Sequence, residues 1–117
     1  MLKILLLLER IVTACRRSPI VDTYTVLTLR ADVLKLRVHL VDGSFIEVFH
    51  NIATGKSAFA LIAAESRIYG KDKDNAKMGW HVHPAENPET HKPCDPVSFE
   101  ESLAEVEALR FRSPQDG

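Results

Sequence analysis

The chain has 117 residues, which is enough for one hydrophobic core and too few for two. Apolar residues make up 45% of it and charged residues 26%, which excludes a disordered, collagen-like or disulfide-stapled chain. Fifteen Lys and Arg against sixteen Asp and Glu give a net charge of −1, so overall charge does not predict a nucleic-acid partner. We expect residues 1–112 to form a single domain and residues 113–117 to be a disordered tail.

The N-terminal residues 1–17 predict a helix, because apolar side chains recur every three or four positions and Ser18-Pro19 follows. Further leucines at Leu2, Leu6 and Leu7 widen the apolar surface beyond one stripe. The helix is therefore either buried from more than one side or in contact with a partner chain, which includes a second copy in a homo-oligomer.

The apolar run Ile4–Leu8 is shorter than the core of a signal peptide and far shorter than a membrane span. Two cysteines, Cys15 and Cys94, are too few for a disulfide framework. We expect a reduced, soluble, cytoplasmic protein with no membrane partner.

Six segments of β-branched, aromatic or alternating residues predict strands, over residues 21–30, 34–40, 44–50, 57–62, 66–71 and 80–83. A short helix over Ala58–Ala64 is the alternative for the fourth segment. Four prolines predict an irregular loop over residues 84–96. Ser98-Phe99-Glu100-Glu101 is a capping box that begins a last helix, whose predicted buried stripe is Phe99, Leu103, Val106 and Leu109. The order predicts an α+β domain, with an antiparallel sheet of five or six strands and both helices on one face.

The dipeptide Asp42-Gly43 is typical of a two-residue hairpin turn, which would place positions summing to 85 opposite each other. This register puts Glu47 on the apolar face between Phe45 and Phe49. A carboxylate there is costly unless it is paired or protonated. Either the register is shifted and leaves Glu47 in water, or Glu47 is held in a cleft for acid–base work.

The densest polar cluster follows Trp80, where His81 and His83 point to the same face of a predicted strand. Two imidazoles side by side suit an acid–base pair, because their pKa lies near neutral. A metal site is the alternative, with His91 and Cys94 completing a set of ligands that zinc accepts. A solvated or purely structural pair is the third interpretation.

Cations and aromatic residues alternate just before this pair, at Arg67, Tyr69, Lys71, Lys73 and Trp80. Single-stranded RNA binds to such surfaces, with bases on the rings and phosphates on the cations. The same pattern also fits a charged turn beside a buried tryptophan.

Several short motifs resemble the TumE-like toxins of bacterial and archaeal toxin–antitoxin systems, over roughly residues 20–109. They are Asp42-Gly43-Ser44, Arg67-Ile68-Tyr69-Gly70, Gly79-Trp80-His81-Val82-His83-Pro84, the Pro-x-x-His at 88–91 and Ser98-Phe99-Glu100-Glu101. The resemblance implies a compact α+β toxin with RNA-cleaving activity and a helix-turn-helix antitoxin as its partner. The histidine–proline segment carries over onto His81 and His83.

The leading hypothesis is a metal-independent ribonuclease without a cofactor, in which His81 and His83 are the acid–base pair and Glu47 is a third member. Arg67 and Lys71 would contact the phosphate. A non-catalytic interaction module and a small His/Cys metalloprotein are the alternatives.

Overall fold

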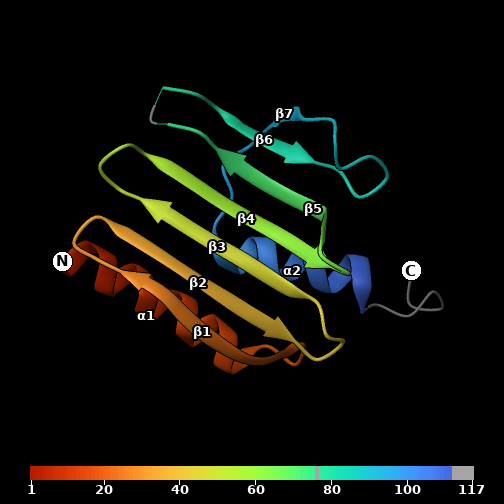
Figure 1. Ribbon diagram of the computed structural model, residues 1–117, viewed down its shortest axis with the longest axis horizontal. Helices are drawn as coiled ribbons and strands as arrows, with labels where there is room; N and C mark the ends of the chain where they lie inside the picture. The colour runs from red at the N-terminus through yellow and green to blue at the C-terminus, as the bar shows by residue number, and fades with distance from the viewer. Residues whose placement is uncertain (76, 112–117) are drawn as a thin grey trace.

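An antiparallel sheet forms the body of the molecule, and each strand pairs with the next along the chain (Figure 1). The computed structural model describes residues 1–75 and 77–111, so the predicted tail at 113–117 lies outside the described residues. The strands are β1 (Val21–Leu29), β2 (Val33–Leu40), β3 (Phe45–Asn51), β4 (Lys56–Ala63), β5 (Ser66–Lys73), β6 (Trp80–His83) and β7 (Lys92–Cys94). The helices are α1 (Leu2–Arg17) and α2 (Phe99–Arg110).

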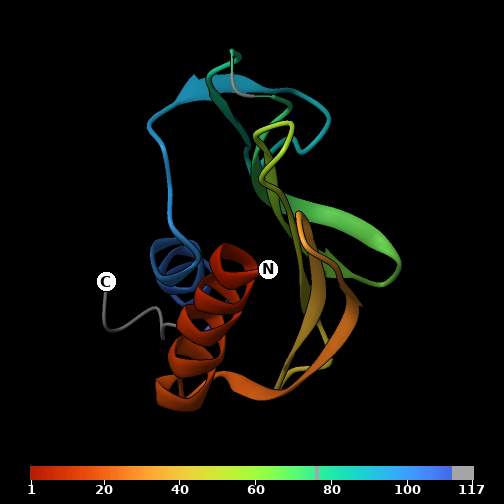
Figure 2. The ribbon, with the colours of Figure 1, turned by 90° about the vertical axis from the view of Figure 1, so that its left-hand side faces the viewer.

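Both helices lie on the same side of the sheet (Figure 2), which confirms the predicted α+β architecture. Within residues 1–75 and 77–111 the sheet has seven strands, one more than the upper prediction of six. No helix in the described part of the chain is both long and apolar enough to cross a membrane.

The ends of the helices follow from local sequence. α1 ends where Ser18 adopts extended backbone ahead of Pro19. α2 begins with the predicted capping box, in which the Ser98 hydroxyl accepts from the Glu101 amide and the Glu101 carboxylate accepts from the Ser98 amide. The predicted stripe of α2 is wrong at Leu109, which is 48% exposed, because Ser102 is the residue buried beside Leu103 and Val106.

The core lies between the helices and one face of the sheet. Strand β2 alternates strictly, with Leu34, Leu36, Val38 and Leu40 buried. Ile46 and Val48 of β3 and Phe59 and Leu61 of β4 continue the same layer, and Ile4, Ile11, Phe99 and Val106 close it from the helices. The alternate residues of these strands point to the opposite side, which we call the outer face.

The β2–β3 hairpin has a different register from the predicted one. Leu40 pairs with Ser44 through a three-residue loop, in which Gly43 has φ +90° and the Asp42 carboxylate accepts from the Ser44 amide. A turn followed by a left-handed residue is the common form of such loops. Facing positions therefore sum to 84, so Arg37 lies opposite Glu47 and Ile46 and Val48 are buried instead of Phe45 and Phe49.

Strand β7 was not predicted, because Pro93 removes a backbone donor. Pro93 lies opposite His81 in the last strand of the sheet, where one edge has no neighbouring strand. A proline is tolerated on such an edge. The prediction of an irregular loop is therefore wrong for Lys92–Cys94.

Candidate functional site

Three histidines and one aspartate meet on the outer face, near the end of the sheet formed by β5, β6 and β7. His81 lies opposite Asp72 in the sheet, and the Nε2 atom of His83 lies 2.9 Å from Asp72 Oδ2. The His91 ring centroid is 5.7 Å from that of His81 and 5.7 Å from that of His83. Asp72, His81, His83 and His91 are called the histidine cluster below.

His83 is the buried member of the cluster, with 9% of its surface exposed. Its Nε2 atom faces the Asp72 carboxylate, and its Nδ1 atom lies 3.2 Å from the Pro88 carbonyl oxygen. Both neighbours are hydrogen-bond acceptors, so both ring nitrogens are engaged inside the protein. His83 also stacks on His91, with an angle of 11° between the rings. It therefore orients the cluster, while the partly exposed His81 and the exposed His91 are accessible to a ligand.

Arg67 lies beside the cluster because β5 contains an irregularity. Arg67 pairs with Ile62 and Tyr69 pairs with Leu61, which leaves Ile68 as an extra residue. A β-bulge of this kind changes which face the following residues point to. Arg67 consequently lies on the outer face, where its Nη2 atom donates to the Pro88 carbonyl that also contacts His83.

The rest of the predicted RNA-binding set lies on the opposite face. The Tyr69 hydroxyl donates to the Glu105 carboxylate of α2 at 3.0 Å, and the Lys71 ammonium contacts the same carboxylate at 2.7 Å. Trp80 stacks on the core residue Phe59 with 5.9 Å between ring centroids. Lys73 follows Lys71 in the alternation and points to the same side. The predicted surface is therefore divided, and only Arg67 accompanies the histidines.

The Tyr69 hydroxyl shows how far this face is removed from solvent. Burial raises the pKa of Tyr69, and the neighbouring Glu105 carboxylate raises it further. The hydroxyl is thus a neutral donor that links the sheet to α2. It contributes to packing rather than to the histidine cluster.

Glu47 does not join the cluster. Its carboxylate lies 3.4 Å from Arg37 and 3.6 Å from Lys35, both on β2. Three strand spacings separate β3 from β6, so the backbone at Glu47 is about 14 Å from the backbone at His83. The carboxylate beside the histidines is Asp72, which lies just beyond the predicted strand at 66–71. Its position beside His83 depends on the pairing of β5 with β6, which the sequence pattern does not show.

The predicted metal set is also divided. Cys94 pairs with Trp80, on the side of the sheet that faces α2, whereas His81, His83 and His91 lie on the outer face. Burial raises the pKa of the Cys94 thiol, which disfavours the thiolate that binds metals. Among residues 1–75 and 77–111, no group of three or more His, Cys, Asp or Glu side chains is arranged to hold a metal ion.

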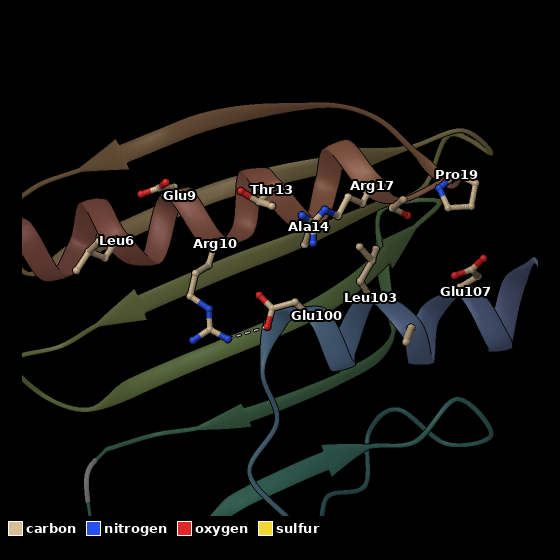
Figure 3. A pocket seen from close by; sticks show the side chains of 12 residues that line it. Leu6, Glu9, Arg10, Thr13, Ala14, Arg17, Pro19, Glu100, Leu103 and Glu107 are labelled. Carbon is tan, nitrogen blue, oxygen red and sulfur yellow. Dashed lines mark hydrogen bonds and ion pairs between the residues drawn. The ribbon is translucent and has the colours of Figure 1, made fainter.

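A groove lies between the helices, on the side away from the sheet (Figure 3). This groove has a volume of about 730 Å³, and Leu6, Ala14, Leu103 and Ala104 contribute apolar surface to it. An ion pair of 2.9 Å between Arg10 and Glu100 crosses it. Exposed leucines continue along α1 beside the groove, at Leu2 (71%), Leu5 (44%) and Leu6 (52%).

No family model matches the chain, and searches of curated proteins and of solved structures give no match. The resemblance to the TumE-like toxins therefore stays a prediction. Two features of the molecule bear on its function, the histidine cluster and the groove.

Proposed function

We propose that the chain is a cytoplasmic, metal-independent ribonuclease that uses the histidine cluster and acts as the toxin of a toxin–antitoxin system. The observation that carries the proposal is the pair of accessible rings, His81 and His91, held beside Arg67 on one open face. The structure supports His91 rather than His83 as the partner of His81, because His83 is buried and engaged at both nitrogens.

The reaction that suits this arrangement is attack of the RNA 2′-hydroxyl on the adjacent phosphorus. One histidine removes the proton of the 2′-hydroxyl as the new P–O bond forms, and the other gives a proton to the 5′-oxygen as its bond to phosphorus breaks. Ring centroids 5.7 Å apart let both imidazoles contact oxygens of the same phosphodiester. Arg67 stabilises the negative charge that develops on the phosphate.

Asp72 and His83 support this reaction without touching the substrate. The contacts of His83 with the Asp72 carboxylate and the Pro88 carbonyl fix its ring, and the fixed ring stacks on His91. A residue that is held from both sides restricts the orientation of its neighbour. His83 is therefore a positioning residue in this proposal.

The test is cleavage of a labelled, mixed-sequence, single-stranded RNA by the purified protein in the presence of EDTA. We expect His81→Ala to slow cleavage by roughly 10²- to 10⁴-fold, the usual contribution of a general acid or base. DNA of the same sequence should remain intact, because it lacks the 2′-hydroxyl.

His50→Gln is the matched control, because His50 is a histidine on the opposite face, 2.9 Å from Ser57. It should cleave RNA at the wild-type rate if it folds, as circular dichroism would show. Equal rates for His81→Ala and the wild type, or no cleavage by folded wild type, would contradict the proposal. Loss of cleavage on addition of EDTA would instead support a metal site.

The interaction module is the second candidate function, and the groove between α1 and α2 favours it. An apolar groove bordered by Leu2, Leu5 and Leu6 suits a partner helix, such as one from a helix-turn-helix antitoxin or from a second copy of the chain. A Leu6→Glu protein that loses a binding partner or self-association while histidine variants retain it would support the module. The circular dichroism spectrum of Leu6→Glu shows whether the protein is folded. Loss of binding counts only if the variant is folded.

A further inference from the structure

A strip of small residues crosses the outer face next to the histidine cluster. Residues of β3, β4, β5 and β6 lie side by side in the order Glu47, Ala60, Gly70 and His83, so two small residues separate Glu47 from His83. Ala58 lies between Phe49 and Asp72 in the neighbouring row. A Cβ atom at Gly70 would lie 2.8 Å from the Phe59 carbonyl oxygen, so this position excludes any side chain. Gly70 is buried and the Arg67 side chain lies against it, so Ala58 and Ala60 form a low floor that Arg67 borders on the histidine side.

Aromatic rings and cations line the far side of this floor. Phe45 and Phe49 of β3 are partly exposed on the outer face. The Arg37 guanidinium lies 4.2 Å from the centroid of the Phe45 ring, and the Lys56 ammonium lies 5.6 Å from that of Phe49. These contacts place positive charge directly beside ring faces on which a planar group can stack.

Four cations and two carboxylates lie along the strip. Lys35, Arg37 and Lys56 lie near the rings and Arg67 lies at the histidine end, whereas Glu47 and Asp72 are the facing carboxylates. Glu47 is paired with Lys35 and Arg37, and Asp72 is paired with His83. The strip thus has two more cations than carboxylates, and two of these cations lie over the partly exposed rings of Phe45 and Phe49.

From these features we infer that the outer face binds single-stranded RNA across its width. Bases stack on Phe45 and Phe49, and phosphates contact Lys35, Arg37 and Lys56. The strand then crosses the floor of Ala58 and Ala60 and passes Arg67 to reach the histidine cluster. Bases must be unstacked to reach the rings, so a duplex does not fit. The path toward cleavage rests on the proposed function, whereas binding itself does not require it.

The test measures binding separately from cleavage, by fluorescence anisotropy with a labelled single-stranded RNA whose 2′-O-methyl riboses prevent 2′-hydroxyl attack. Phe49→Leu keeps an apolar side chain but removes the stacking ring, and should weaken binding by roughly 5- to 150-fold. Arg37→Gln should weaken binding and reduce its dependence on salt. Phe111→Leu is the matched control, because Phe111 follows the last turn of α2 and packs against the core. This variant should bind RNA like the wild type.

Binding by the wild type that weakens in Phe49→Leu and Arg37→Gln supports the inference, even when no RNA is cleaved and the proposed function fails. Unchanged affinity in folded Phe45→Leu, Phe49→Leu and Arg37→Gln overturns it, even when RNA is cleaved. The absence of binding by folded wild type, or equal affinity for a duplex, overturns it as well.

Discussion

The two faces of the sheet differ in almost every physical property, although they are made by alternate residues of the same strands. On β2, Leu34, Leu36, Val38 and Leu40 are covered by the helices, whereas Lys35, Arg37 and His39 point to the other side. The covered face holds the core and the Tyr69–Glu105–Lys71 contacts, and the outer face holds the histidine cluster. Because successive side chains of a strand point to opposite faces, one strand contributes alternate residues to the core and to the candidate site.

The largest expected effect is a difference in the free energy of unfolding between substitutions of Leu36 and of its neighbour Lys35 on β2. Leu36→Ala removes a fully buried side chain and should lower the free energy of unfolding by about 2–5 kcal/mol. Lys35→Ala changes a side chain that is 42% exposed, and should alter it by less than about 0.5 kcal/mol. Urea denaturation of both proteins measures the difference, and equal losses would contradict the assignment of faces.

The pH dependence of stability should come in part from His50 on the covered face. Burial lowers the pKa of His50 to about 4, and its Nε2 atom is buried without a hydrogen-bond partner among the described residues. Between pH 6.5 and 4 the unfolded chain binds a proton that the folded chain excludes, so stability falls on acidification by on the order of 2 kcal/mol. The contribution is fully present above pH 6.5.

Thermal unfolding from pH 7.5 to 4.5 would measure this slope. The His50→Gln protein should have a flatter profile than the wild type, because its side chain does not titrate. Parallel profiles for the two proteins would contradict the burial of an uncharged His50.

The bulge in β5 predicts opposite phenotypes for two cations close in sequence. Lys71→Met should lower the free energy of unfolding by about 1–2 kcal/mol. The Lys71 side chain is only 16% exposed, so the substitution leaves the Glu105 carboxylate without its cationic partner in a partly buried site. Arg67→Met should leave stability unchanged and slow RNA cleavage. Denaturation and cleavage are measured on both proteins. A loss of stability in Arg67→Met together with normal cleavage would contradict the assignment of Arg67 to the outer face.

The smallest effect concerns the β4–β5 turn, where Ala64 and Glu65 have φ of 51° and 67°. Left-handed backbone costs a residue with a side chain about 1–2 kcal/mol, and Asn-Gly is the favoured pair in such two-residue turns. The double substitution Ala64→Asn with Glu65→Gly should therefore raise the free energy of unfolding by about 1 kcal/mol. A lower melting temperature would show that the turn contributes contacts that the backbone geometry does not reveal.

The sequence predicted the elements better than their pairing. Alternation located β2 and β6, and the capping box located the start of α2, because these signals depend on residues next to each other. The β2–β3 register failed because Asp42-Gly43 fits both a two-residue and a three-residue loop, while the two-residue turn with positive φ formed at Ala64-Glu65. Shifting a register by one position moves a whole set of side chains to the other face, as it did for Glu47.

The candidate site was predicted in part for the same reason. His81 and His83 share a face because of their spacing alone, and the structure brings His91 to them. Asp72 was missed because its place beside His83 depends on the pairing of β5 with β6. Tyr69, Lys71 and Arg67 looked equivalent in sequence, and the bulge at Ile68 separates them.

Cleavage of single-stranded RNA in the presence of EDTA, compared between His91→Ala and Cys94→Ala, tests whether the histidine cluster is the active site. The two residues are close in sequence, but His91 stacks on His83 on the outer face and Cys94 lies opposite Trp80 on the covered face. We expect His91→Ala to slow cleavage by roughly 10²- to 10⁴-fold, whereas Cys94→Ala should cleave like the wild type. Equal rates in the two folded proteins, or a loss confined to Cys94→Ala, would contradict the assignment of the active site to the histidine cluster.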